Sequence, residues 1–175
     1  MAGDEDTLEV ALQADEAWVR VQGRGSFKVS TALKRFAILA MEQGATRLLV
    51  DLGACHGMDS TFMGVLAGLA LRLRKDRGEL VLVGVSPKNA ALVETLGLDR
   101  LVRQQQAEPA GAEAPAGLVL LDTAADKRAT AETMLAAHEV LAVAAPGNAL
   151  RFQEVLAYLR DAVRRLDETG TPKGV

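Results

Sequence analysis

Few residues in this 175-residue chain have the types and spacing that catalysis needs. An enzymatic nucleophile needs a base and an orienting group within reach, and the nearest local combination is the adjacent pair Cys55-His56. Adjacent side chains rarely converge on one atom, and a lone cysteine more often serves as a small hydrophobic residue. His138 falls beside an apolar stripe, which favours a packing role over that of a base or ligand. We therefore expect no catalytic residue.

Motifs for nucleotides and metals are incomplete. The segment Gly23-Arg24-Gly25-Ser26-Phe27-Lys28 begins like a dinucleotide fingerprint, but Lys28 replaces the third glycine, so we interpret it as a glycine turn. The phosphate-loop pattern GxxxxGK[ST] does not occur. One cysteine and two histidines are too few for a closed zinc site, and a single cysteine cannot form an intramolecular disulfide. We expect no cofactor, no metal and a cytoplasmic location.

The most informative stretch is Asp59-Ser60-Thr61, which lies between a loop and a glycine-containing helix. A short polar side chain at that junction can cap the helix by accepting a backbone N–H bond. Phosphorylation is the functional alternative. It adds about −1.5 to −2 charges, which the amides and dipole of a helix N-terminus tolerate. The residues alone leave both roles open, a structural cap or a switch that changes the surface charge without refolding.

Alternating strand-like and helix-like segments position these residues. Two alternating apolar runs predict an antiparallel hairpin at 8–14 and 17–22. Apolar runs without polar alternation predict two strands buried on both faces, at 47–52 and 79–85. Helical spacing of apolar residues predicts helices at 32–43 and 60–77, and a Ser86-Pro87 start signal predicts a third helix at 86–97. A short final strand is predicted at 101–102.

This order predicts an α/β domain over residues 1–104, because strand-helix-strand units form parallel pairs joined by crossovers. Residues 105–124, rich in alanine, proline and glycine, predict a linker, in which the run at 118–121 is too short to classify. Two amphipathic stripes predict a helical hairpin over 125–168, with Asn148 capping the second helix. The stripes could bury against each other, the first domain or another chain.

The composition argues against binding to nucleic acid and against a membrane span. The net charge is −3, aromatic residues make up 3%, and the pI is about 5.5, so the basic excess typical of nucleic-acid binding is missing. Nowhere do about 18 uncharged apolar residues follow one another, so we expect no membrane span.

Several short motifs occur in a fixed order over residues 50–102. They are Asp51-Leu52, Asp59-Ser60-Thr61, Gly64, Gly78, Leu82-Val83 and Gly97-Leu98-Asp99. This layout resembles the core of a STAS domain, the family of bacterial anti-sigma factor antagonists. With the weaker N-terminal elements, the resemblance covers about 8–104. It implies a mixed β-sheet flanked by helices and no catalysis by the domain itself.

In such antagonists, the serine after the aspartate is phosphorylated by a kinase-type anti-sigma factor, and the unphosphorylated form binds that factor and releases the sigma factor. By position this serine is Ser60, with Thr61 as the alternative acceptor. The resemblance therefore implies an anti-sigma factor serine kinase as protein partner. We expect the contact residues to be Ser26, Lys28, Asp59, Ser60, Thr61 and Phe62.

Two features depart from the family pattern. Phe62 stands where many members place glycine, which adds bulk beside the proposed phosphorylation site. The predicted helical hairpin is not part of the minimal domain and could pack on it, form a homo-oligomer or bring a specific partner. The alternative function is therefore a STAS scaffold without a switch, or a subunit of a larger signalling or transporter-associated assembly.

Overall fold

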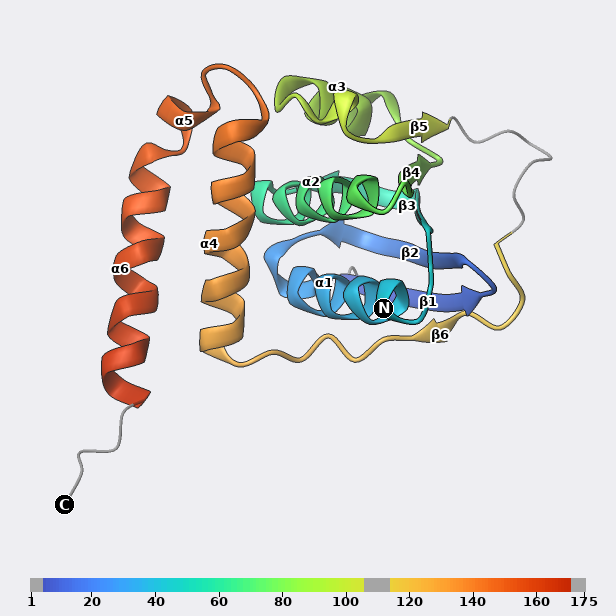
Figure 1. The fold of residues 1–175 in the computed structure, drawn as a ribbon, viewed down its shortest axis with the longest axis horizontal. Helices are drawn as coiled ribbons and strands as arrows, with labels where there is room; N and C mark the ends of the chain where they lie inside the picture. The colour runs from blue at the N-terminus through green and yellow to red at the C-terminus, as the bar shows by residue number, and fades with distance from the viewer. Residues whose placement is uncertain (1–4, 106–113, 171–175) are drawn as a thin grey trace.

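The sheet is built from a hairpin followed by parallel strands that helices connect (Figure 1). The computed structural model describes residues 5–105 and 114–170. Six strands lie in the order β5-β4-β3-β2-β1-β6, with β2 to β5 parallel and β1 antiparallel to both β2 and β6. The strands are β1 (Thr7–Gln13), β2 (Glu16–Gly25), β3 (Arg47–Met58), β4 (Glu79–Val83), β5 (Arg103–Gln105) and β6 (Val119–Leu120). The predicted mixed α/β sheet is confirmed.

The connecting helices all contribute to one core on one face of this sheet. Its largest fully buried side chains include Leu33, Phe62 and Leu82. The second face carries a smaller cluster of Trp18, Leu49 and Val81. Both faces of the central strands are thus buried as predicted, but helices cover only one. The helices and the short 3-10 turn are α1 (Phe27–Glu42), α2 (Ser60–Lys75), α3 (Pro87–Thr95), η1 (Leu98–Arg100), α4 (Lys127–Ala144), α5 (Asn148–Arg151) and α6 (Gln153–Gly170).

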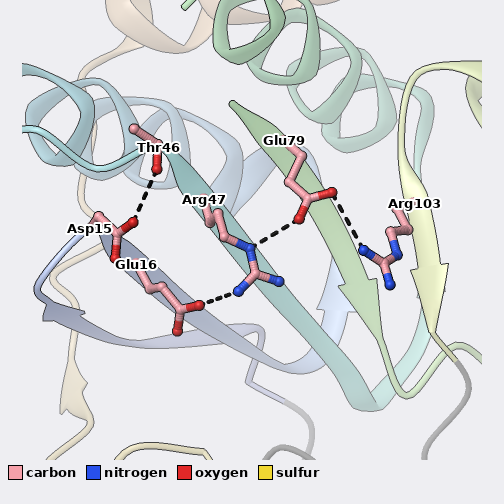
Figure 2. A network of polar contacts seen from close by, with 6 residues as sticks. All are labelled: Asp15, Glu16, Thr46, Arg47, Glu79 and Arg103. Atoms are coloured by element: carbon pink, nitrogen blue, oxygen red, sulfur yellow. Dashed lines mark hydrogen bonds and ion pairs between the residues drawn. The ribbon is translucent and has the colours of Figure 1, made fainter. Parts of the chain in front are cut away.

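Ion pairs join the starts of the parallel strands (Figure 2). Arg47 on β3 pairs with Glu16 on β2 and with Glu79 on β4, its direct neighbours in the strand register. Glu79 also lies 3.7 Å from Arg103 on β5. Each partly exposed pair contributes little by itself, but opposite charges on adjacent strands favour this register. The carboxyl ends of the same strands, at the opposite edge, carry the starts of the helices.

Three elements, β2, β3 and α1, extend well beyond their predicted bounds. β3 continues to Met58 through the stretch predicted as a loop, because β2 continues beside it as far as Gly25. Two register shifts in this pairing each place an extra residue on β3, so β3 is the bulged strand, and the predicted glycine turn contains the end of β2 beside it. α1 begins at Phe27, five residues before the prediction, because the Ser26 side chain accepts a hydrogen bond from the Lys28 amide and caps it.

The C-terminal helices pack on the first domain. α4 lies across α1 and α2, and α6 packs on the outer side of α4 (Figure 1). The second helix is broken at Phe152, between α5 and α6. The prediction that Asn148 caps it is wrong, because its side-chain amide donates to the carbonyls of Leu96 and Leu141, and Gly147, at a positive φ, precedes α5. Residues 106–113 of the predicted linker lie outside the described residues, and its run at 118–121 contains β6.

Two glycines of α2 face α4 with different clearances. A Cβ on Gly64 would lie 2.4 Å from the carbonyl oxygen of Ala137, closer than such atoms approach. A Cβ on Gly68 would lie 3.7 Å from Val140, an ordinary contact. Gly64 therefore permits the backbones of α2 and α4 to touch, and Gly68 does not have that role.

We expect Gly64→Ala to lower the free energy of unfolding by about 1–3 kcal/mol, because the clash is with backbone and cannot relax by a side-chain rotation. Gly68→Ala is the matched control and should raise stability by up to about 1 kcal/mol, since alanine favours helix. Urea unfolding of the two variants measures both effects. Equal effects of the two substitutions would contradict the close contact at Gly64.

Candidate functional site

The carboxyl ends of β2, β3 and β4 lead directly into α1, α2 and α3. In parallel sheets these ends meet at one edge, where binding sites commonly form. A side chain caps each helix there: Ser26 caps α1, Asp59 caps α2 and Ser86 caps α3. The caps satisfy amides that have no partner within a helix, so this edge has a defined shape. The predicted start of α3 at Ser86-Pro87 is confirmed.

Asp59 joins the first two helices. One carboxylate oxygen accepts a hydrogen bond from the Phe62 amide at 2.9 Å and so caps α2. The other oxygen accepts from the Phe27 amide at 2.7 Å, at the start of α1. The amide of Asp59 donates to the carbonyl of Gly25 at 2.9 Å. The structural cap at Asp59-Ser60-Thr61 is therefore the carboxylate of Asp59, which leaves both hydroxyls free of that role.

Ser60 is the first residue of α2, and its hydroxyl contacts α4. The Oγ atom lies 2.9 Å from Nε2 of His138, while Nδ1 of the same ring lies 2.7 Å from the carbonyl oxygen of Met134. A carbonyl can only accept, so Nδ1 donates to Met134, and in the neutral ring Nε2 then accepts from the Ser60 hydroxyl. The ring is 3% exposed and packs edge-on against Phe152 with centroids 5.4 Å apart.

A serine bonded to a histidine is also how an activated nucleophile is arranged. Such a site needs open space in front of the hydroxyl for a substrate, and here α4 occupies that side of Ser60. A cavity of about 140 Å³ does lie among α1, α2 and α4, but its walls include neither Ser60 nor His138. The pair is better explained as a polar contact that holds α4 to α2.

The other predicted contact residues gather around this edge with different exposures. Lys28 is exposed, whereas Ser26 is 5% exposed and donates to Asp6 at 2.6 Å. Thr61 is 3% exposed. Phe62 is fully buried beneath Gly25, where a Cβ would lie 2.7 Å from its ring. The extra bulk of Phe62 therefore fills the core beneath the end of β2 and does not project beside Ser60.

Cys55 lies on β3 as a buried packing residue. Its thiol donates a weak hydrogen bond to the carbonyl of Gly57 at 3.2 Å, and its own carbonyl accepts from the Asn89 side chain at 2.9 Å. These contacts match the interpretation of the lone cysteine as a small hydrophobic residue.

His138 is the residue of this candidate site whose contact the sequence did not reveal. Its place beside an apolar stripe indicated packing, which is correct, but not its bond to Ser60, 78 positions away in the chain. One signal was present, since a polar ring on a buried stripe requires a hydrogen-bond partner. The partner could not be named without knowing which surface α4 covers.

The sequence model of the family described as "Mlab, STAS domain" matches residues 8–103. The chain belongs to the STAS domain family. The fold of its STAS domain is similar to the unphosphorylated form of the anti-sigma factor antagonist SpoIIAA, with a TM-score of 0.51 and 17% identity over 57% of this chain and 88% of that one. A candidate anti-sigma factor antagonist from Thermotoga maritima matches with a TM-score of 0.51 and 16% identity over 55% of this chain and 84% of that one.

At these identities the likeness concerns the fold, and the predicted STAS family is confirmed. The helices α4, α5 and α6 lie beyond the residues that the family matches. Among the described residues, no helix combines the length and the apolar character needed to cross a bilayer.

The double role of Asp59 predicts a graded loss of stability. Asp59→Ala removes hydrogen bonds to both helices and should cost about 1–2 kcal/mol of unfolding free energy, whereas Asp59→Asn keeps one acceptor oxygen and should cost less. Ser86→Ala, which removes one cap bond at α3, is the control. Urea unfolding would contradict the double role if Asp59→Ala cost no more than Ser86→Ala.

Proposed function

We propose that this STAS protein is an anti-sigma factor antagonist that Ser60 phosphorylation switches. The unphosphorylated form binds a kinase-type anti-sigma factor in the cytoplasm and frees the sigma factor, and phosphorylation ends that binding. The domain is thus the substrate of an enzyme and has no catalytic role of its own. The observation that carries the proposal is the placement of Ser60 at the start of α2, directly after the capping carboxylate of Asp59.

Asp59 and Ser60 have separate roles, and this separation suits a phosphorylation switch. Asp59 makes the cap, so a phosphate on Ser60 removes no bond that holds the start of α2. The free amides and the dipole of the helix tolerate the added charge, and the domain stays folded. The phosphate and the Asp59 carboxylate then place concentrated negative charge at one edge, which weakens docking by repulsion and by the cost of desolvation.

Exposure distinguishes the candidate acceptors and contacts. Ser60 is partly exposed, whereas Thr61 is 3% exposed, which supports Ser60 as the acceptor. On the α1 side of the edge, Phe27 is 42% exposed and Lys28 is exposed, so a partner can reach both. Ser26 and Phe62 support this edge from within in the described state.

The alternative is a STAS scaffold that does not switch. The contact between Ser60 and His138 favours it, because a serine held permanently beneath α4 would never meet a kinase. The two functions differ in whether phosphate reaches Ser60.

We expect Ser60 to carry phosphate in the protein purified from its own host, in an amount that changes with stress. Intact-mass and phosphopeptide analysis measures this directly, and the absence of phosphate under every condition would support the scaffold. Ser60→Ala is the control that should abolish the modified peptide, and Thr61→Ala should leave it unchanged.

We also expect Ser60→Asp to weaken binding to the cognate kinase at least about tenfold, or ~1.4 kcal/mol, relative to Ser60→Ala. The reason is the second negative charge beside Asp59, and titration calorimetry with the purified kinase measures the difference. Equal affinities for the two variants would count against electrostatic switching.

A further inference from the structure

α4 covers the proposed phosphorylation site with a contact surface that is partly apolar and partly polar. Its buried residues are Thr133, Ala137, His138 and Leu141, of which Ala137 and Leu141 belong to the hydrophobic core cluster. The polar two make side-chain bonds to the helices beneath. Thr133 bonds to Thr31 of α1 at 3.0 Å, and His138 bonds to Ser60 of α2. The docking of α4 therefore depends in part on the hydroxyl of Ser60.

Packing along the same contact is uneven. At Gly64 the backbones of α2 and α4 touch. One turn further along, a half-open pocket of about 140 Å³ is lined by residues of α1, α2 and α4, Gly68 and Val140 among them. The contact between α2 and α4 is therefore closer at Gly64 than at Gly68.

Phosphate on Ser60 disrupts the present bond to His138. Phosphorylation replaces the hydroxyl proton of Oγ, and a phosphorus atom turned toward α4 would fall in the 2.9 Å between Oγ and Nε2. The ring cannot retreat easily, because Met134 and Phe152 hold it from the other side. A phosphate on that side would also lie in a partly buried surface beside Asp59, at a cost of desolvation.

We infer that α4, with α5 and α6 attached, is an intramolecular mask that occupies the docking surface beside Ser60 on α1 and α2, and that it must leave before Ser60 can be phosphorylated. The kinase and α4 compete for this surface, so the described state is the closed one. The part of this inference that concerns the kinase rests on the proposed function. The part that concerns the exclusion of phosphate by α4 does not.

The connection to the first domain permits the movement. Residues 121–126, between β6 and α4, contain no helix or strand. Opening at this hinge breaks the bonds of Thr133 and His138 and removes Ala137, Leu141, Phe152 and Leu156 from the core cluster. The other buried members of that cluster all come from residues 8–102 and stay in place. Asn148 bonds to the Leu96 carbonyl at the far end of α4, so full release requires that bond to break as well.

Hydrogen exchange of the full chain tests the mask without any kinase. Protein carrying phosphoserine at position 60, incorporated during translation, and the Ser60→Asp variant should both exchange the amides of α4 at least about tenfold faster than Ser60→Ala. Amides of β3 should stay protected in all three. Gly64→Ala should also speed exchange in α4, because it disturbs the docking without adding charge, and Gly68→Ala should not.

Unchanged exchange in the phosphoserine protein would overturn the inference. Slower exchange would overturn it too, because it would mean that the phosphate binds α4 through His138. Loss of protection in β3 as well as α4 would mean that the whole domain unfolds, and it would equally contradict a hinged mask.

An engineered disulfide that holds α4 against α1 tests the part of the inference that concerns competition with the kinase. The hydroxyl oxygens of Thr31 and Thr133 lie 3.0 Å apart, so cysteines at both positions can close a bond that holds α4 down. In host lysate with ATP, the oxidised double variant should gain phosphate on Ser60 at least about tenfold more slowly than the reduced one, and Thr31→Cys alone should show no difference. Equal phosphorylation of both forms would overturn the competition.

If the reduced double variant and the unchanged protein both remain unphosphorylated in every lysate, the proposed function fails. The exchange experiment then still decides whether α4 and a phosphate on Ser60 exclude each other. The two failures are therefore distinguishable.

Discussion

The arrangement of the site depends on the carboxylate of Asp59. Its two oxygens accept from the starts of α1 and α2, which are separated along the chain by the whole of α1 and β3. This single group fixes the spacing of two helices and thereby the surface on which α4 lies. Because the carboxylate provides the cap, the neighbouring hydroxyl of Ser60 remains available to bond with another element.

The C-terminal helices cover a surface of α2 that the STAS domain alone would leave open. In the domain alone, the side of α2 that carries Ser60 and Gly64 would face solvent or a partner. Here Gly64 admits the backbone of α4, and Ser60 supplies the polar contact next to it. The same small residue and the same hydroxyl thus serve intramolecular packing and the proposed regulation, which links the stability of the extension to the chemical state of one side chain.

Local signals were readable from the sequence and long-range ones were not. The start of α3 was predictable because Ser86 and Pro87 act within one helical turn. The extension of β3 to Met58 was not, since it depends on bulged pairing with β2 and not on the apolar pattern of β3 itself. Asn148 was read as a cap because that is its local preference, whereas its amide satisfies carbonyls of two separate helical segments.

The candidate site also combines local features that the sequence predicts with long-range contacts that it does not. Asp59, Ser60 and Thr61 could be predicted to begin a helix, and the resemblance to the family singled out Ser60. Their contact with His138 could not, because nothing in the pattern of α4 states which surface its polar positions meet. The inward direction of the Phe62 side chain could not be predicted either, since it depends on the space beneath Gly25.

The distance in sequence between Ser60 and His138 also sets an order in time. The two residues are 78 positions apart, so a ribosome that adds about 5–20 residues per second needs about 4–16 s to pass from one to the other. Throughout that interval the growing chain contains Ser60 but not the helix that covers it. A newly made molecule therefore passes through an uncovered state once, before its C-terminal helices exist.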